Sequence, residues 1–305
     1  MNERVTVGVT PWLPWPLSRW DWWTEPVRAE RLAALRIGLA IVLLVDVLVQ
    51  YLPHYADFFG AGSLGSPEVF AGRNTGHWHW SPLRGLEDAR LFLPILLIWL
   101  SAAFLLLIGW KPRLAAVVAW VLSISVLNLN YYLHNSGDRI RNIILFYLML
   151  TPCGAAWSLD NCIPRKRGGH KGPVYISPWA LRLLFVQMAL IYFFNGFYKL
   201  MGADWRDGDV LHFVLGNVQW ARWSITDLPV PYGVTRVLTW LILIWEIGFP
   251  LFVSMRPIRN MTLWFGVLLH LGMAISLQLG MFPFYMLCLY LPLVPWERWS
   301  KRIDQ

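Results

Sequence analysis

Apolar stretches of about 20 residues recur along most of this chain and constrain its fold more than any other feature. A helix of that length crosses the hydrocarbon core of a bilayer, and a helix satisfies its own backbone hydrogen bonds where water is absent. Charged residues make up 14% of the chain, against roughly 25% in soluble domains. The sequence therefore predicts an all-α fold, a polytopic helical membrane bundle.

About eight of these stretches are predicted to cross the membrane. They lie at about 31–52, 90–109, 114–133, 139–152, 179–200, 234–254, 260–279 and 281–296. The tryptophan-rich residues 1–30 lack a continuous apolar core, so they are interpreted as an interfacial segment and not as a cleaved signal peptide. The transmembrane domain is expected over 31–297, followed by a short cytoplasmic tail at 298–305.

Lysine and arginine are distributed unevenly between the predicted loops. Most of them lie in the N-terminal segment, the turns at 110–113 and 255–259, the 153–178 loop and the C-terminal tail. The positive-inside rule then places both termini in the cytoplasm, and in a bacterium the membrane would be the plasma membrane. The same rule accounts for the net charge of +8, so nucleic-acid binding is not expected.

Residues 187–209 place charged groups directly at the end of an apolar stretch. Tyr192, Asn195 and Lys199 recur at i, i+3 and i+7, so they share one face of a helix. Lys199 either extends to the lipid headgroups or acts as a functional group, and in an apolar pocket it could serve as a neutral base. The acids and Trp205 that follow form either a solvated turn or a group that orients Lys199 or a substrate.

A second polar group lies between the third and fourth stretches. Tyr131 and His134 share nearly one helical face, and Asn135 and Asp138 follow at once. These residues form either a hydrogen-bonded site or an interfacial turn in which Asp138 caps the next helix. The predicted topology puts them on the outer side, as it does Lys199.

Other polar residues have simpler interpretations. Two histidines, His77 and His79, without a nearby carboxylate or cysteine are weak evidence for zinc, so no metal site is expected. Glu246 and His270 fall near mid-bilayer and are predicted to pair with each other or with Asp46, because an unpaired charge there is costly.

The chain lacks several sequence signatures of soluble enzymes. No Walker A loop, GxSxG elbow, dinucleotide-binding fingerprint or HExxH motif is present, so the corresponding hydrolase and nucleotide functions are not supported. The three cysteines form no CxxC pair, and a structural disulfide is not expected.

Several stretches resemble a known family. NSGDRIRNIILFYLMLTPCGAAWSLD at 135–160 and YFFNGFYKLMGADWRDG at 192–208 are similar to the horizontally transferred transmembrane (HTTM) domain, which is shared with vitamin K-dependent γ-glutamyl carboxylases. WEIGFPLFV at 245–253 and HLGMAISLQLGMFPFYMLCLYL at 270–291 fit the same pattern.

The resemblance implies a function as well as a fold. In the carboxylases a lysine in the segment that matches 192–208 deprotonates reduced vitamin K, and Lys199 stands at that position. The implied cofactor is reduced vitamin K or a menaquinone-like naphthoquinol, oxidised by oxygen, with carboxylation as the reaction that this oxidation drives. The catalytic candidates are Lys199, His134 and Asp138. The candidates for binding the quinol are Asn195, Tyr192, Tyr131 and Trp205. A protein or peptide substrate would bind on the outer face, through the loops at 53–88 and 201–232 or a partner.

Two other classes of function remain open. A non-catalytic membrane module that binds a quinone, a lipid or a partner protein would keep Lys199 protonated and tolerate arginine there. A transporter would need Glu246 and His270 to line a water path, with broken helices at matching positions in two halves. Membrane lipid is an expected partner in every case, and the oligomeric state is not predicted.

Overall fold

The computed structural model describes residues 20–64, 81–129, 134–166, 172–223, 229–296 and 298. Helices dominate these residues, and the only strands among them are β1 (Val27–Arg28) and β2 (Tyr175–Ile176), which pair with each other. The all-α prediction is therefore confirmed.

The chain divides into two compact units, each described by itself. The first, called the α2 unit, contains residues 28–176 and 279–305, and the second, the α9 unit, contains residues 1–27 and 177–278. The helices of the α2 unit are α2 (Ala29–Asp46), the π-helical turn η1 (Val47–Tyr51), α3 (Tyr55–Phe58), η2 (Ala89–Leu91), α5 (Phe92–Ile108), α6 (Pro112–Leu127), α7 (Ser136–Leu150), α8 (Leu159–Lys166), α14 (Phe282–Cys288) and η4 (Leu291–Leu293). Those of the α9 unit are α1 (Trp20–Thr24), α9 (Trp179–Met201), α10 (Ala203–Asp207), α11 (Val210–Gly216), α12 (Tyr232–Ser254) and α13 (Arg259–Ser276).

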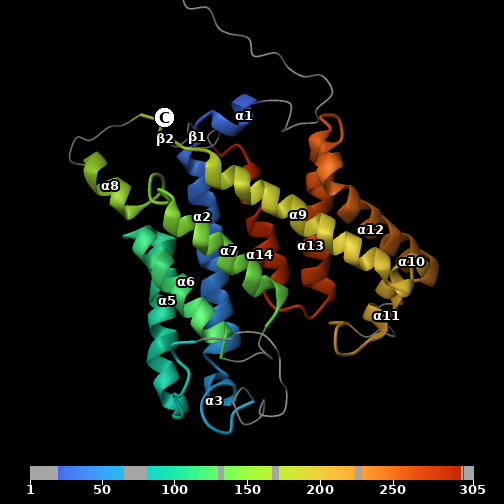
Figure 1. Cartoon of the computed structure of the whole chain (residues 1–305), viewed down its shortest axis with the longest axis horizontal. Helices are drawn as coiled ribbons and strands as arrows, with labels where there is room; N and C mark the ends of the chain where they lie inside the picture. The colour runs from blue at the N-terminus through green and yellow to red at the C-terminus, as the bar shows by residue number, and fades with distance from the viewer. Residues whose placement is uncertain are drawn as a thin grey trace, which may run out of the picture. The chain divides into compact units, whose positions relative to one another are not determined.

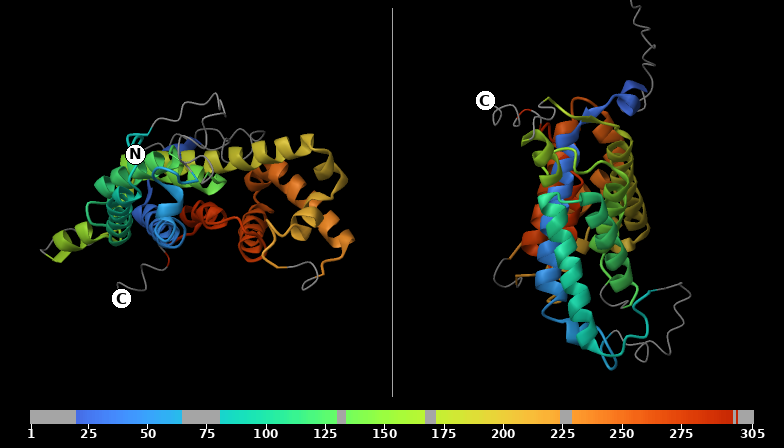
Figure 2. Two further views of the ribbon diagram at one scale, coloured as in Figure 1. Left: turned by 90° about the horizontal axis from the view of Figure 1, so that it is seen from below. Right: turned by 90° about the vertical axis from the view of Figure 1, so that its left-hand side faces the viewer.

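The core of the α2 unit is a layer of helices packed side by side. Helix α5 packs between α2 and α6, α6 packs on α7, and α14 packs on both α7 and α2 (Figures 1 and 2). Leu35, Leu39 and Leu43 recur four residues apart on α2, so they share one helical face, and all three are fully buried.

Helices α5 and α6 are joined by a turn that their own residues specify. Gly109 ends α5 with a φ of 71°, a left-handed conformation that favours glycine. Pro112 begins α6, where the missing N–H costs nothing because the first turn of a helix leaves it unbonded. This turn fixes the position of Lys111, whose own φ is 42°.

In the α9 unit, α12 packs against both α9 and α13, and the short helices α10 and α11 pack on α12 (Figure 1). Helix α1 packs on the start of α9, where Arg182 Nε donates to the Trp22 carbonyl at 2.8 Å and the guanidinium lies over the Trp22 ring. The unit therefore has α12 at its centre.

Four helical segments among the described residues are long and apolar enough to cross a membrane: Ala29–Tyr51, Ala89–Ile108, Trp179–Met201 and Tyr232–Ser254. A helix also lies in each of the other four predicted stretches, but α6, α7 and α14 have 16, 15 and 7 residues, below the roughly 20 needed to span. The predicted count of about eight spans is therefore not confirmed.

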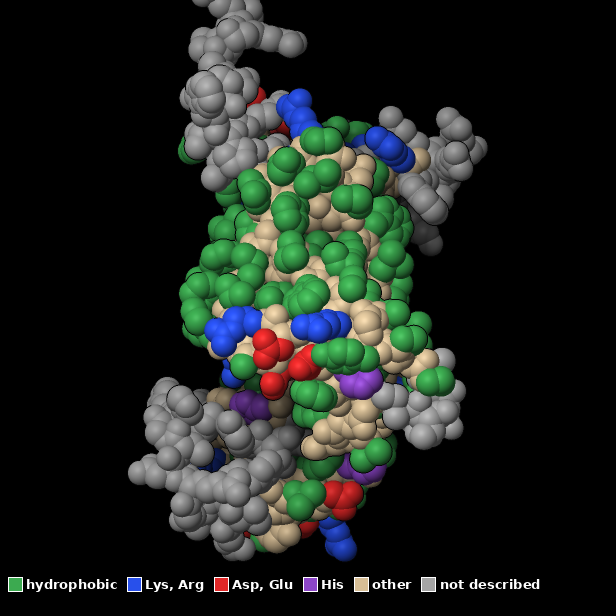
Figure 3. Space-filling model, turned by 90° about the vertical axis from the view of Figure 1, so that its right-hand side faces the viewer, with side chains coloured by type: hydrophobic (Ala, Val, Ile, Leu, Met, Phe, Trp, Pro, Cys, Tyr) green, Lys and Arg blue, Asp and Glu red, His purple; other side chains and the backbone are tan. Residues whose placement is uncertain are grey.

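The surface agrees with a membrane environment. Exposed apolar side chains project from α12 at Val237, Leu241, Ile244 and Leu251. Figure 3 shows hydrophobic side chains over much of the face that it presents, with a narrow band of charged side chains below them. Apolar side chains exposed in this number suit contact with lipid and not with water.

Cysteine reactivity tests the predicted orientation. All three cysteines are free, but Cys162 is exposed whereas Cys153 and Cys288 are buried, and burial raises the pKa of Cys153 to about 11. Since the thiolate is the reactive form, we expect a membrane-impermeant maleimide to label Cys162 alone, and only from the cytoplasmic side. Cys162→Ser should remove the signal. Labelling of Cys162 in intact cells would contradict the orientation.

Candidate functional site

The predicted base, Lys199, forms an ion pair inside the α9 unit. It lies in the last turn of α9, and its Nζ lies 2.7 Å from Oε1 of Glu246 on α12. The Lys199 side chain is 24% exposed and that of Glu246 is 6% exposed. Lys199 therefore points at a carboxylate of another helix, and this carboxylate is largely withdrawn from the surface.

A glycine lets the two helices approach closely enough for this contact. A Cβ added at Gly196, one turn before Lys199, would lie 2.8 Å from the backbone nitrogen of Ile247 and 2.9 Å from Cβ of Glu246. Both distances are shorter than a carbon tolerates, so only glycine allows the backbones of α9 and α12 to meet there. Small residues have this role at many helix contacts in membranes.

An aromatic ring also lies beside the ammonium group of Lys199. Nζ of Lys199 lies 4.5 Å from the centre of the Trp205 ring, which is within the range of a cation–π attraction. Trp205 belongs to α10, which begins directly after Gly202. The structure thus brings together two of the predicted site residues, Lys199 and Trp205.

A second polar pair lies deeper between α9 and α13. The Tyr192 hydroxyl and Nε2 of His270 are 2.8 Å apart, and both side chains are buried. The Tyr192 ring packs against Trp245 and Phe249 of α12, with centroid distances of 4.6 Å for both. The Asn195 side chain, by contrast, is exposed and makes no hydrogen bond to another side chain among the described residues.

The predicted pairing of Glu246 with His270 or Asp46 is wrong. Glu246 pairs with Lys199, His270 with Tyr192, and Asp46 with Arg141. Each of these buried groups does have a partner, as expected. The sequence alone does not reveal which helices bring the partners together.

In the α2 unit, Asn135 and Asp138 cap helix α7. Asn135 Oδ1 accepts hydrogen bonds from the backbone N–H groups of Gly137 and Asp138, and Asp138 Oδ2 accepts one from the Asn135 N–H at 2.8 Å. This reciprocal arrangement is a capping box. A ring nitrogen of His134, Nε2, lies 2.7 Å from the Leu127 carbonyl at the end of α6. The capping interpretation of Asp138 is therefore confirmed.

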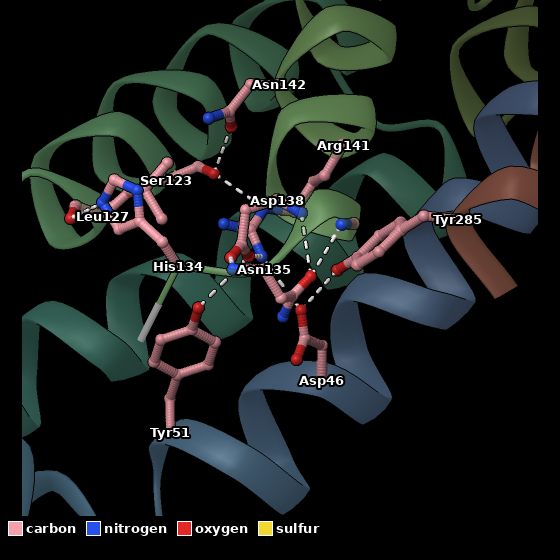
Figure 4. Close-up of polar contacts among 11 residues, drawn as sticks. Asp46, Tyr51, Ser123, Leu127, His134, Asn135, Asp138, Arg141, Asn142 and Tyr285 are labelled. Carbon is pink, nitrogen blue, oxygen red and sulfur yellow. Dashed lines mark hydrogen bonds and ion pairs between the residues drawn. The ribbon is translucent and has the colours of Figure 1, made fainter. Parts of the chain in front are cut away.

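Asp138 also belongs to a buried charge network, drawn in Figure 4. Nη1 of Arg141 lies 2.9 Å from Asp46 Oδ2 and 2.8 Å from Asp138 Oδ1, and the Arg141 side chain is fully buried. Its Nε donates to Ser123 Oγ at 2.7 Å, and the Tyr285 hydroxyl donates to Asp46 Oδ2 at 2.6 Å. Arg141 thus joins α2, α6, α7 and, through Asp46, α14.

Three residues that the sequence singled out lie outside the described residues, namely Tyr131, His77 and His79. The described ranges contain no group of three or more His, Cys, Asp and Glu side chains that could hold a metal ion. Lys199, Tyr192, Asn195 and Trp205 belong to the α9 unit and His134 and Asp138 to the α2 unit, so a joint role for the two sets stays a prediction.

Comparison with known proteins decides the family. Residues 24–299 match the HTTM domain. The chain belongs to the HTTM-domain family. It is also 32% identical over 121 residues to YitO, an uncharacterized protein of Bacillus subtilis strain 168, with 38% of each chain covered. No solved structure matches the chain.

The HTTM match includes both the Lys199–Glu246 pair and the Arg141 network, and it makes the chain a membrane protein of a family related to the carboxylases. Because the aligned part spans 38% of YitO, and YitO is itself uncharacterized, that relative assigns no activity. The residues that sequence analysis missed are Glu246, as the partner of Lys199, and Arg141.

Proposed function

We propose that this HTTM-domain protein is a γ-carboxylase-like membrane enzyme, in which Lys199 activates a reduced naphthoquinol for oxygen-dependent chemistry. The observation that carries the proposal is the 2.7 Å ion pair between Lys199 and the buried Glu246. A lysine that only anchors the helix end would extend toward lipid headgroups, and it would have no need of a buried acid on another helix.

The ion pair supplies a way to form a neutral amine at the site. Transfer of a proton from Lys199 Nζ to Glu246 Oε1 leaves an amine and a carboxylic acid, and the total charge of the pair stays zero. Because burying two charges is costly, a neutral pair is an accessible alternative to the ion pair. Glu246 thus acts as a positioning residue that holds Lys199 and stores its proton.

Aromatic side chains near Lys199 support the binding of a flat ring such as that of a naphthoquinol. Trp205 lies against Nζ, and Tyr192, Trp245 and Phe249 form an aromatic wall between the same helices. The second carboxylate oxygen of Glu246 is buried and has no hydrogen-bond partner among the described residues. A buried, charged acceptor without a partner is costly, which favours the neutral acid form of Glu246 that the proton transfer from Lys199 produces.

In the proposed reaction the amine of Lys199 takes a proton from a quinol hydroxyl. The resulting ammonium group then stabilises the negative charge left on the ligand, as preorganised charges do in enzyme sites. When bound, the naphthoquinol supplies the electrons that reduce oxygen, and in the carboxylases this oxidation drives carboxylation of a glutamate side chain. The substrate would be a protein or peptide on the outer face of the membrane.

The alternative is a non-catalytic membrane module that binds a quinone, a lipid or a partner protein. It is favoured by the engagement of Lys199 in an ion pair, which a permanently charged lysine would also form. The alternative predicts that Lys199→Arg keeps full function, since arginine can pair with Glu246. The enzyme proposal predicts that Lys199→Arg is inactive, because a guanidinium group is not deprotonated in proteins.

Oxygen-dependent formation of quinone epoxide from reduced menaquinone or vitamin K by the purified protein tests the proposal. We expect wild type and Arg256→Met to turn over and Lys199→Met to be inactive. Arg256 is an exposed cation in the turn between α12 and α13, so its removal controls for loss of charge. If neither wild type nor variant turns over but both bind the quinol, the binding module is favoured. Absence of both turnover and quinol binding would overturn the enzyme proposal and the quinone-binding form of the alternative, and would leave a module that binds a lipid or a partner protein.

A further inference from the structure

A groove lies in the α2 unit, between the turn that joins α5 to α6 and the segment that follows α7. Its volume is about 450 Å³, within the range of small-molecule sites. The residues that line it include Lys111, Pro112, Arg113, Leu114, Gly154 and Asp160. None of these residues belongs to the site around Lys199, and the predicted topology puts the groove on the cytoplasmic side.

Two hydrogen bonds between side chains and the backbone hold the groove in shape. Asp160 Oδ2 accepts from the Lys111 N–H at 2.9 Å, and Arg113 Nε donates to the Thr151 carbonyl at 2.8 Å. A Cβ at Gly154 would lie 2.7 Å from Cγ of Pro112, so only glycine lets the segment after α7 pack this closely on Pro112. The walls of the groove are therefore fixed by contacts within the chain itself.

The charges of the groove match a phosphodiester. Lys111 and Arg113 are exposed cations on its rim, and Asp160 is a half-buried carboxylate. Formal charges of two cations and one anion leave a net single positive charge. A phosphodiester carries a single negative charge, and hydroxyl groups on its alcohol would give Asp160 hydrogen-bond donors.

An apolar surface extends from the groove along α6. Leu114, which lines the groove, is 58% exposed, and Val117 and Val121 are 39% and 44% exposed. These residues recur at i, i+3 and i+7, so they form one face of the helix. Trp110, beside the groove, is 43% exposed, as is typical of tryptophan at the level of the headgroups. The groove thus has a charged end at the interface and an apolar extension into the membrane.

We propose that this groove binds an anionic phospholipid with a hydroxyl-bearing headgroup, such as phosphatidylglycerol. The phosphate lies between Lys111 and Arg113, the headgroup hydroxyls donate to Asp160, and an acyl chain follows Leu114, Val117 and Val121 along α6. Basic pockets between helices on the cytoplasmic side of membrane proteins bind lipid headgroups in this way.

Native mass spectrometry of the detergent-purified protein, titrated with phosphatidylglycerol or with phosphatidylethanolamine of the same chains, tests the proposal. We expect wild type and Arg256→Gln to retain phosphatidylglycerol preferentially. The double variant Lys111→Gln, Arg113→Gln should bind it at least roughly tenfold more weakly, because each cation near an anionic headgroup contributes severalfold. Lys111→Gln alone changes one exposed side chain and should show roughly a fivefold loss, which separates lost binding from lost folding.

Two results would overturn the proposal. The first is equal retention of phosphatidylglycerol by wild type and the double variant, or an equal loss in Arg256→Gln. The second is binding of soluble glycerol phosphate as strong as that of the lipid, which would make the ligand a free phosphate ester. Leu114→Asn distinguishes a lipid from a free phosphate ester as the ligand, because it should weaken binding of the lipid and leave binding of glycerol phosphate unchanged.

Discussion

Replacing Arg141 by methionine is expected to lower the stability of the α2 unit by about 3–5 kcal/mol, the cost of leaving buried charges without their partner. Arg141 is fully buried and its Nη1 pairs with Asp46 and Asp138 at 2.9 and 2.8 Å. Methionine has a similar volume and no charge, so it would leave two buried carboxylates close together with no cation between them. Chemical or thermal unfolding in detergent measures the effect.

Arg139→Met is the matched control for this experiment. Arg139 lies two residues earlier on the same helix and its side chain is exposed, so its replacement should change stability by less than about 0.5 kcal/mol. Arg141→Lys should fall between the two, because a lysine keeps the charge but not the planar fork that reaches several acceptors. Equal stabilities for the two methionine variants would contradict the central role of Arg141.

Replacing Glu246 by glutamine is expected to lower quinol turnover by about 100-fold, the lower end of what a positioned acid or base contributes. Glutamine keeps the size of Glu246 and can accept a hydrogen bond from Lys199, but it cannot take the proton. The effect should fall on kcat and leave KM for the quinol nearly unchanged, because the lysine stays in place.

Glu87→Gln provides the control for this prediction. It makes the same chemical change at an exposed residue, and it should leave turnover at the wild-type level. A purely structural role of Glu246 would show differently, as a loss of stability and of quinol binding together. A Glu246→Gln protein with normal kcat would contradict the proton-storing role.

Much of the fold was predictable because bilayer thickness and apolar length are linked. The predicted stretch at 179–200 corresponds to α9 at Trp179–Met201, and the stretch at 234–254 to α12 at Tyr232–Ser254. The stretch at 114–133 agrees less well, because α6 ends at Leu127. Apolar character continues past that residue in the sequence, so hydropathy alone did not locate the end of the helix.

The charge partners were less predictable than the helices. The Lys199–Glu246 contact depends on where α9 crosses α12, and that crossing is set by Gly196, which looks unremarkable in the sequence. Asp46 and Arg141 are 95 residues apart in the chain, and nothing local marks them as partners. By contrast, Arg141 follows Asp138 at i+3, a spacing that places two side chains together on a helix. The Asp138–Arg141 pair could therefore have been predicted from the sequence.

Epoxide formation measured on wild type, Lys199→Met, Glu246→Gln and the double variant tests the central claim most directly. If Lys199 is the base and Glu246 acts only through it, Lys199→Met is inactive and the double variant is no worse, because residues that act as a unit are not additive. Retention of wild-type turnover by Lys199→Met would contradict the account. So would independent, multiplying losses from the two substitutions, since they would show that Glu246 acts without Lys199.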